Sequence, residues 1–77
     1  MPTVLRIGPY RFYFFSHETN EPPHIHVDES SSTTNFWLSP VQLSRAVGFS
    51  AQEVRAIQKL VVENEQVLLE AWNGYFS

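Results

Sequence analysis

Residues 22–28 read Pro22-Pro23-His24-Ile25-His26-Val27-Asp28, and this stretch decides the fold class. From position 24 onward, polar and apolar side chains alternate, which is the two-residue period of a half-buried β-strand. The two prolines cannot donate ladder hydrogen bonds, so they lead into the strand rather than belong to it. The stretch therefore predicts a strand with one apolar face and one face that carries both histidines.

Three further strands are expected around this one. Residues 3–7 have strand character, Gly8-Pro9 is a strong turn signal, and the aromatic-rich residues 10–15 then return to form a hairpin. After a serine-rich turn at residues 29–33, residues 34–38 are expected as the fourth strand. The first half of the chain thus predicts an antiparallel sheet of three to four strands.

The second half of the chain carries helix signals. Ser39 suits an N-cap, Pro40 suits the first helical position and Gly48 suits the residue after a helix, which predicts a short helix over residues 41–47. Residues 50–53 form a capping box, from which a second helix of about 22 residues should run to about residue 72. We therefore expect a single α+β domain over residues 1–77, with the short helix and the long C-terminal helix packed on one face of the sheet.

Composition narrows the class of protein. A chain of 77 residues buries only about 60–65% of the surface that its unfolded form exposes, so a partner or a second copy would add stability. Cysteine is absent, and neither a secretory signal nor a membrane-spanning apolar run is recognisable, which favours the cytoplasm and no membrane. The formal charge is −3 with only five basic residues, so nucleic acid stays open as a partner but is not favoured.

Strand periodicity sorts the sheet residues into two faces. The apolar face, which should receive the helices, holds Leu5, Ile7, Phe12, Phe14, Ile25, Val27, Phe36 and Leu38. The opposite face holds Arg6, Arg11, Tyr13, His24, His26, Asp28, Asn35 and Trp37. A face that mixes Arg, Tyr, His and Trp has the composition of a binding surface, so all of these residues except Asn35 are candidate partner-binding residues.

The two histidines allow several kinds of chemistry. His24 and His26 should point the same way with Cβ atoms roughly 6.5–7 Å apart, close enough to share a metal ion if Asp28, His17 or Glu21 supplied a third ligand. They could equally hydrogen-bond neighbouring strands and loops, or contact a partner. Spacing alone assigns no metal ligand and no cofactor.

Acid–base catalysis is a further alternative. A histidine near its ordinary pKa of about 6.5 can accept and donate a proton, so His24, His26, Arg11 and Tyr13 are candidate catalytic residues of a small metal-independent ribonuclease. The acidic net charge and the lack of a glycine-rich phosphate loop count against this alternative. The sequence leaves open whether the protein is an enzyme.

Several segments resemble one known family of small bacterial and phage proteins, catalogued as domain of unknown function 4160. They are residues 1–12, the string Glu-Pro-Pro-His-Ile-His-Val at residues 21–27, and residues 36–38, 48–50 and 70–72. The resemblance implies a protein without an established activity, commonly encoded beside a second small protein, catalogued as domain of unknown function 2442, in an arrangement like a toxin–antitoxin pair. It also implies that His24 and His26 are the characteristic residues.

The resulting hypothesis is a protein-binding component of a toxin–antitoxin-like, two-protein module. The long helix should carry one apolar stripe, extended sideways by Val62 and Leu69, and the stripe consists of Val54, Ile57, Leu60, Val61, Val67, Leu68, Ala71 and Trp72. The open sheet face and this extended stripe would bind the cognate small protein encoded nearby or a second copy in a homodimer. The histidine-dependent ribonuclease is the alternative function.

Overall fold

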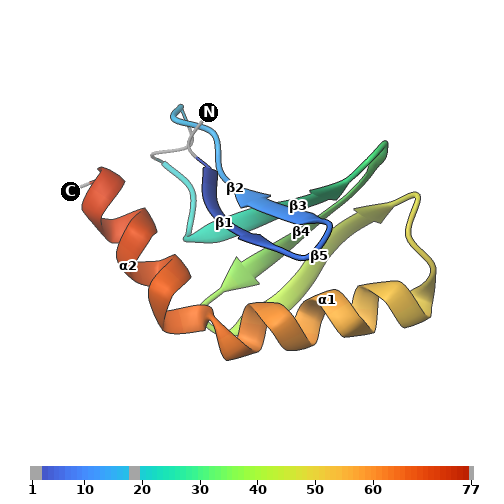
Figure 1. Cartoon of the computed structure of the whole chain (residues 1–77). Coiled ribbons are helices and arrows are strands. Elements are labelled where there is room, and N and C mark those ends of the chain that lie inside the picture. The colour runs from blue at the N-terminus through green and yellow to red at the C-terminus, as the bar shows by residue number, and fades with distance from the viewer. Residues whose placement is uncertain (1–2, 18–19, 77) are drawn as a thin grey trace.

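The computed structural model describes residues 3–17 and 20–76, which form one sheet and two helices (Figure 1). The sheet is antiparallel, and its five strands follow one another in chain order from one edge to the other. The strands are β1 (Thr3–Ile7), β2 (Tyr10–Tyr13), β3 (His24–Glu29), β4 (Ser32–Leu38) and β5 (Val41–Val47). The expected α+β class is confirmed, with five strands rather than three to four.

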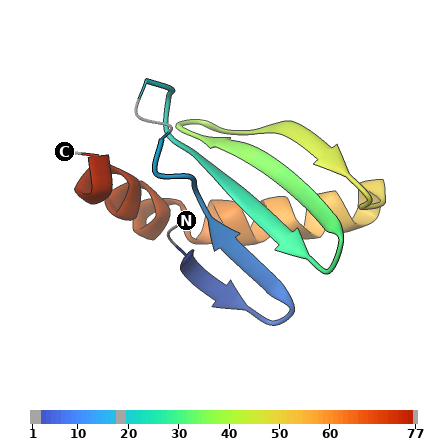
Figure 2. The same ribbon diagram turned by 90° about the horizontal axis from the view of Figure 1, so that it is seen from above.

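The two helices occupy different places relative to the sheet. Helix α1 (Ala51–Glu63) crosses one face of the sheet, and seen from above it lies behind the strands (Figure 2). Helix α2 (Glu65–Phe76) turns away from α1 and lies beside the end of the sheet (Figures 1 and 2). The other face of the sheet is left without a helix.

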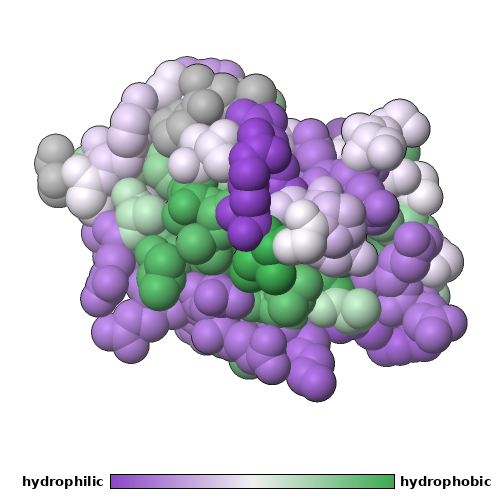
Figure 3. Space-filling model, viewed as in Figure 1, coloured by the Kyte–Doolittle hydropathy of each residue, from purple (hydrophilic) through white to green (hydrophobic). Residues whose placement is uncertain are grey.

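The core lies between the sheet and the helices. Its buried residues come from the predicted apolar face and from the inner sides of both helices: Phe12, Phe14, Ile25, Val27, Phe36, Leu38, Val54, Ile57, Val61, Leu68 and Trp72. Leu5 and Ile7 of the edge strand β1 are partly buried and pack against this cluster. Apolar side chains are visible between the β1 edge and the polar band along α1 (Figure 3). The predicted assignment of apolar strand residues to the helix-covered face is thus confirmed.

The short helix predicted for residues 41–47 is wrong, because this segment is strand β5. Leu38 pairs with Val41, so Ser39 and Pro40, joined by a cis peptide bond, form a two-residue turn between β4 and β5. As a strand, this segment satisfies its backbone groups by hydrogen bonds to β4. An isolated helix of seven residues would be too short to be stable. Gly48 has φ +88°, and a Cβ built on it would come within 2.6 Å of the Ser32 hydroxyl oxygen. The glycine therefore ends a strand rather than a helix.

The single long helix is also wrong, because Asn64 divides it. The Asn64 side-chain Nδ2 donates to the Leu60 carbonyl oxygen at 2.8 Å, and the backbone φ of −113° is not helical. The break turns α2 out from under the sheet, so Val67, expected on the buried stripe, is 48% exposed. Helix α2 continues past the expected stop near Trp72, and Phe76 packs against Phe14 and Trp72 with ring centroids 5.4 and 4.4 Å apart.

The start of α1 is as predicted. The Glu53 backbone N–H donates to the Ser50 hydroxyl at 3.1 Å, and the Ser50 backbone N–H donates to the Glu53 carboxylate at 2.9 Å. The second bond lowers the pKa of Glu53 from its ordinary value, because it favours the ionised carboxylate. This contribution to stability is present above about pH 4.5 and is lost as the pH falls through the lowered pKa.

Removing the cap tests this assignment. We expect Ser50→Ala to lower the free energy of unfolding by about 1 kcal/mol, because one backbone donor of the first turn loses its acceptor. Urea denaturation at pH 7 measures the change. Ser16→Ala, in an exposed turn, is the control and should change stability by less than about 0.5 kcal/mol. Equal effects of the two substitutions would contradict the role of the cap.

Candidate functional site

Strand register arranges the residues of the uncovered face in rows. One row crosses all five strands, because consecutive members lie directly opposite one another: Thr3, Tyr13, His26, Asn35 and Arg45. A second row consists of Arg6, Arg11, Asp28, Thr33 and Val47. A third row pairs His24 with Trp37 and Trp37 with Gln42. We call this surface the open face; it contains every candidate catalytic and partner-binding residue predicted from the sequence.

Aromatic rings fill the middle of the open face. Tyr13 stacks on His26 with centroids 5.2 Å apart and ring planes 18° from parallel, and Phe15 meets the same histidine edge-on at 4.9 Å. His24 contacts His26 at 5.3 Å and Trp37 at 5.6 Å. Edge-to-face and offset contacts of this kind stabilise ring clusters beyond the area they bury. The cluster makes this part of the face rigid.

The expected exposure of the histidines is not found. His24 is 4% exposed and His26 is 9% exposed, although no helix covers this face. His24 is buried by Trp72 of α2, because the centroids of the two rings lie 4.7 Å apart at the end of the sheet. Each Nδ1 lies 2.9 Å from an oxygen, that of His24 from the Pro22 carbonyl and that of His26 from the Asn35 side chain. Because both oxygens are acceptors, each Nδ1 carries the proton.

Tyr13, Asp28 and Arg11 form a polar group beside the rings. The Tyr13 hydroxyl donates to Asp28 Oδ2 at 3.0 Å, and Arg11 lies over the tyrosine ring with its guanidinium carbon 4.5 Å from the centroid. Arg11 Nε also donates to the Thr3 hydroxyl at 2.9 Å. Asp28 Oδ1 is buried and has no hydrogen-bond partner among residues 3–17 and 20–76. Tyr13 is thus the donor that stabilises this carboxylate.

A shallow hollow of about 310 Å³ lies in the open face next to the rings. Its lining consists of Tyr13, Phe15, His26, Thr33, Asn35, Arg45 and Val47. Sequence reasoning gave no functional role to Phe15, Thr33, Asn35, Arg45 or Val47. Arg45 and Val47 were missed because their segment was assigned to a helix, although the alternation from Val41 to Leu43 was a usable strand signal.

The open face does not provide a three-ligand metal site within the described part of the chain. No three histidine, aspartate or glutamate side chains come together there in a way that could hold an ion. His17 lies against Phe15 at 5.5 Å, and Asp28 is engaged by Tyr13. The third ligand that His24 and His26 would need is therefore not found among these residues.

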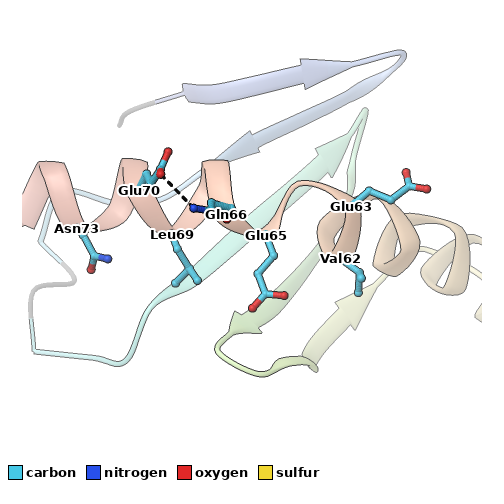
Figure 4. A pocket seen from close by; sticks show the side chains of 7 residues that line it. All are labelled: Val62, Glu63, Glu65, Gln66, Leu69, Glu70 and Asn73. Carbon is cyan, nitrogen blue, oxygen red and sulfur yellow. Dashed lines mark hydrogen bonds between the residues drawn. The ribbon is translucent and has the colours of Figure 1, made fainter.

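A second hollow, of about 580 Å³, lies on the helices away from the open face (Figure 4). It is lined by Val62, Glu63, Glu65, Gln66, Leu69, Glu70 and Asn73. Its charged groups are all carboxylates, and Val62 and Leu69 are the residues that extend the apolar stripe of the predicted long helix sideways. Within the described residues, neither helix is long and apolar enough to cross a membrane.

The comparisons with known proteins agree with the resemblance seen in the sequence. Residues 10–73 match the family model described as Domain of unknown function (DUF4160). The chain therefore belongs to this family. No curated protein and no solved structure matches it.

Replacing Tyr13 tests the polar group. We expect Tyr13→Phe to lower the free energy of unfolding at pH 7 by about 1 to 3 kcal/mol, because the partly buried Asp28 carboxylate would lose its hydroxyl donor. Urea denaturation measures the change. Tyr75→Phe is the matched control, because Tyr75 is 51% exposed. Equal effects of the two substitutions would contradict the role of Tyr13.

The contribution of Tyr13 to stability should also depend on pH. Burial first, and then the hydrogen bond to Asp28 and its charge, raise the pKa of Tyr13 above the ordinary 10.0. The protonated form is favoured by folding, so this contribution is complete below about pH 10 and is lost as the pH rises through the raised pKa. Unfolding measured between pH 8 and 11.5 should therefore show a steeper alkaline loss for the wild type than for Tyr13→Phe.

Proposed function

We propose that the chain is a protein-binding domain that docks a partner protein on the open face. The family resemblance suggests which partner this is, namely a second small protein encoded nearby, as in a toxin–antitoxin pair. The observation that carries the proposal is the combination of charge and aromatic rings on the one sheet face without a helix. The following features support it.

Basic residues are concentrated on this face. Arg6, Arg11 and Arg45, three of the five basic residues of the chain, belong to its rows, whereas Arg55 and Lys59 lie on α1. The chain as a whole carries a net charge of −3. A locally basic face on an acidic domain steers and orients a partner that carries acidic groups.

The parts of the face that a partner could touch are large and apolar or cationic. Trp37 and Phe15 are half-buried, Val47 is 45% exposed, and Arg6 and Arg45 are exposed. Aromatic and arginine side chains are the residues that most often dominate binding energy in protein interfaces. The buried rings of Tyr13, His24 and His26 contact one another and the half-buried rings of Phe15 and Trp37, which orders this surface.

Charge reversal at Arg6 tests the proposal. The chain is co-expressed with the small protein encoded beside it, and the dissociation constant of the purified pair is measured by calorimetry. We expect Arg6→Glu to weaken binding about tenfold or more, because it places a carboxylate against the acidic partner. Arg55→Glu makes the same charge change on α1 and should stay within about twofold. Equal effects, or no complex with the wild type, would contradict the proposal.

One observation favours the ribonuclease as a second candidate: the hollow brings His26 close to a cation, Arg45. The burial of His24 beneath Trp72 counts against a reaction that needs two accessible imidazoles. A fluorescent oligoribonucleotide assay distinguishes the candidates. Cleavage that is lost in His24→Ala/His26→Ala supports the enzyme, whereas the binding domain should leave the RNA intact.

A further inference from the structure

We propose that the hollow in the open face binds a carboxylate of an acidic side chain of the partner protein, held by Arg45 and Asn35. The inference rests on the proposed function, because it describes the chemistry of a contact on the same face. It assigns a role to two residues that lie on adjacent strands, directly opposite each other.

The hollow carries one positive charge and no negative one. Of the described residues that line it, Arg45 alone has a formal charge. Its side chain is exposed. An arginine fork matches the two oxygens of a carboxylate, and such charge-assisted hydrogen bonds are stronger than neutral ones. The charge of the hollow therefore selects an anion.

Asn35 adds an oriented donor. Its Oδ1 accepts the Nδ1–H of His26 at 2.9 Å, and the remaining polar atom of the amide, Nδ2, is a donor. The stack of His26 on Tyr13 fixes the imidazole, which in turn fixes the amide. The Thr34 hydroxyl donates to the Arg45 carbonyl at 2.7 Å and holds the backbone of β5 beside β4. The Asn35 amide and the backbone of Arg45 are thus each held by a neighbouring group.

A single carboxylate fits this site better than a phosphate chain. Binding of a nucleic acid backbone draws on several lysine and arginine side chains along the strand. The hollow contains one cation, and the chain carries a net charge of −3. The apolar wall formed by Phe15 and Val47 would contact the methylene groups of an acidic side chain. An aspartate or glutamate of a protein partner meets each of these conditions.

The test uses N-acetylglutamate N′-methylamide as the probe, because its side-chain carboxylate is its only charged group. The uncharged N-acetylglutamine N′-methylamide is its counterpart. Nuclear magnetic resonance follows the side-chain N–H signals of Asn35 and Arg45 during titration of the full chain. We expect saturable shifts with N-acetylglutamate N′-methylamide only. Arg45→Gln should weaken the response about tenfold or more, and Arg55→Gln, on α1, should leave it unchanged. Asn35→Asp should also abolish it, because the aspartate keeps an acceptor for His26 but repels the probe.

Three outcomes would overturn the inference. The first is equal shifts with N-acetylglutamine N′-methylamide, and the second is equal loss in Arg45→Gln and Arg55→Gln. The third is saturation by a hexauridylate but not by N-acetylglutamate N′-methylamide, which would assign the hollow to phosphate. The proposed function has a separate readout, since a partner complex that needs Arg6 but tolerates Arg45→Gln would refute only the carboxylate site. A complex insensitive to Arg6→Glu would refute the binding face itself.

Discussion

Phe12, Val27 and Thr34 lie directly opposite one another on β2, β3 and β4, and each is fully buried. This buried row fixes the register of the sheet. A slip of one residue would turn the phenylalanine and the valine toward water and bring histidine rings into the core, at a cost of several kcal/mol. The same register places Tyr13, His26 and Asn35 opposite one another on the other face. The arrangement of the open face is therefore a consequence of core packing.

The open face is stabilised by its own side chains rather than by a covering helix. Ring contacts bury Tyr13, His24 and His26. The Tyr13 hydroxyl bonds to Asp28, the His24 Nδ1 bonds to the Pro22 carbonyl, and the His26 Nδ1 bonds to the Asn35 side chain. Buried polar groups that are satisfied in this way make a surface rigid and specific. Trp72 connects this cluster to α2, because it contacts both His24 and the core residue Phe14. The side chains of the open face are thus ordered by contacts within the domain, and the proposed partner would need to order few of them.

Much of the fold follows from the sequence because local and tertiary preferences agree. The alternation at residues 24–28 and the capping box at Ser50 each specify one structure, and both are found. Residues 41–47 differ, since Ser39, Pro40 and Gly48 fit helix caps as well as they fit a turn and a strand end. The segment forms a strand because the free edge of β4 supplies hydrogen-bond partners for its backbone. The break at Asn64 also escaped prediction, because one asparagine inside a long apolar pattern rarely ends a helix.

The sequence predicts which face of the sheet carries the candidate site, but it does not predict the burial of the histidines or the presence of Arg45. Periodicity placed Arg11, Tyr13, His26 and Trp37 on one surface correctly, yet it carries no information on how tightly rings pack, so the burial of both histidines was missed. Arg45 could be assigned to the site only once β5 was known. His24 and His26 are buried, whereas the accessible residues of the open face include Arg6, Arg45, Phe15 and Trp37.

The account depends most directly on the position of Arg45 opposite Asn35 on the open face. Nuclear Overhauser spectroscopy of the labelled chain measures this proximity. The account predicts contacts between protons of Asn35 and Arg45 and between those of Asn35 and His26, with none of the i to i+3 contacts of a helix across residues 41–47. Helical contacts in that segment, without any contact from Arg45 to Asn35, would contradict it.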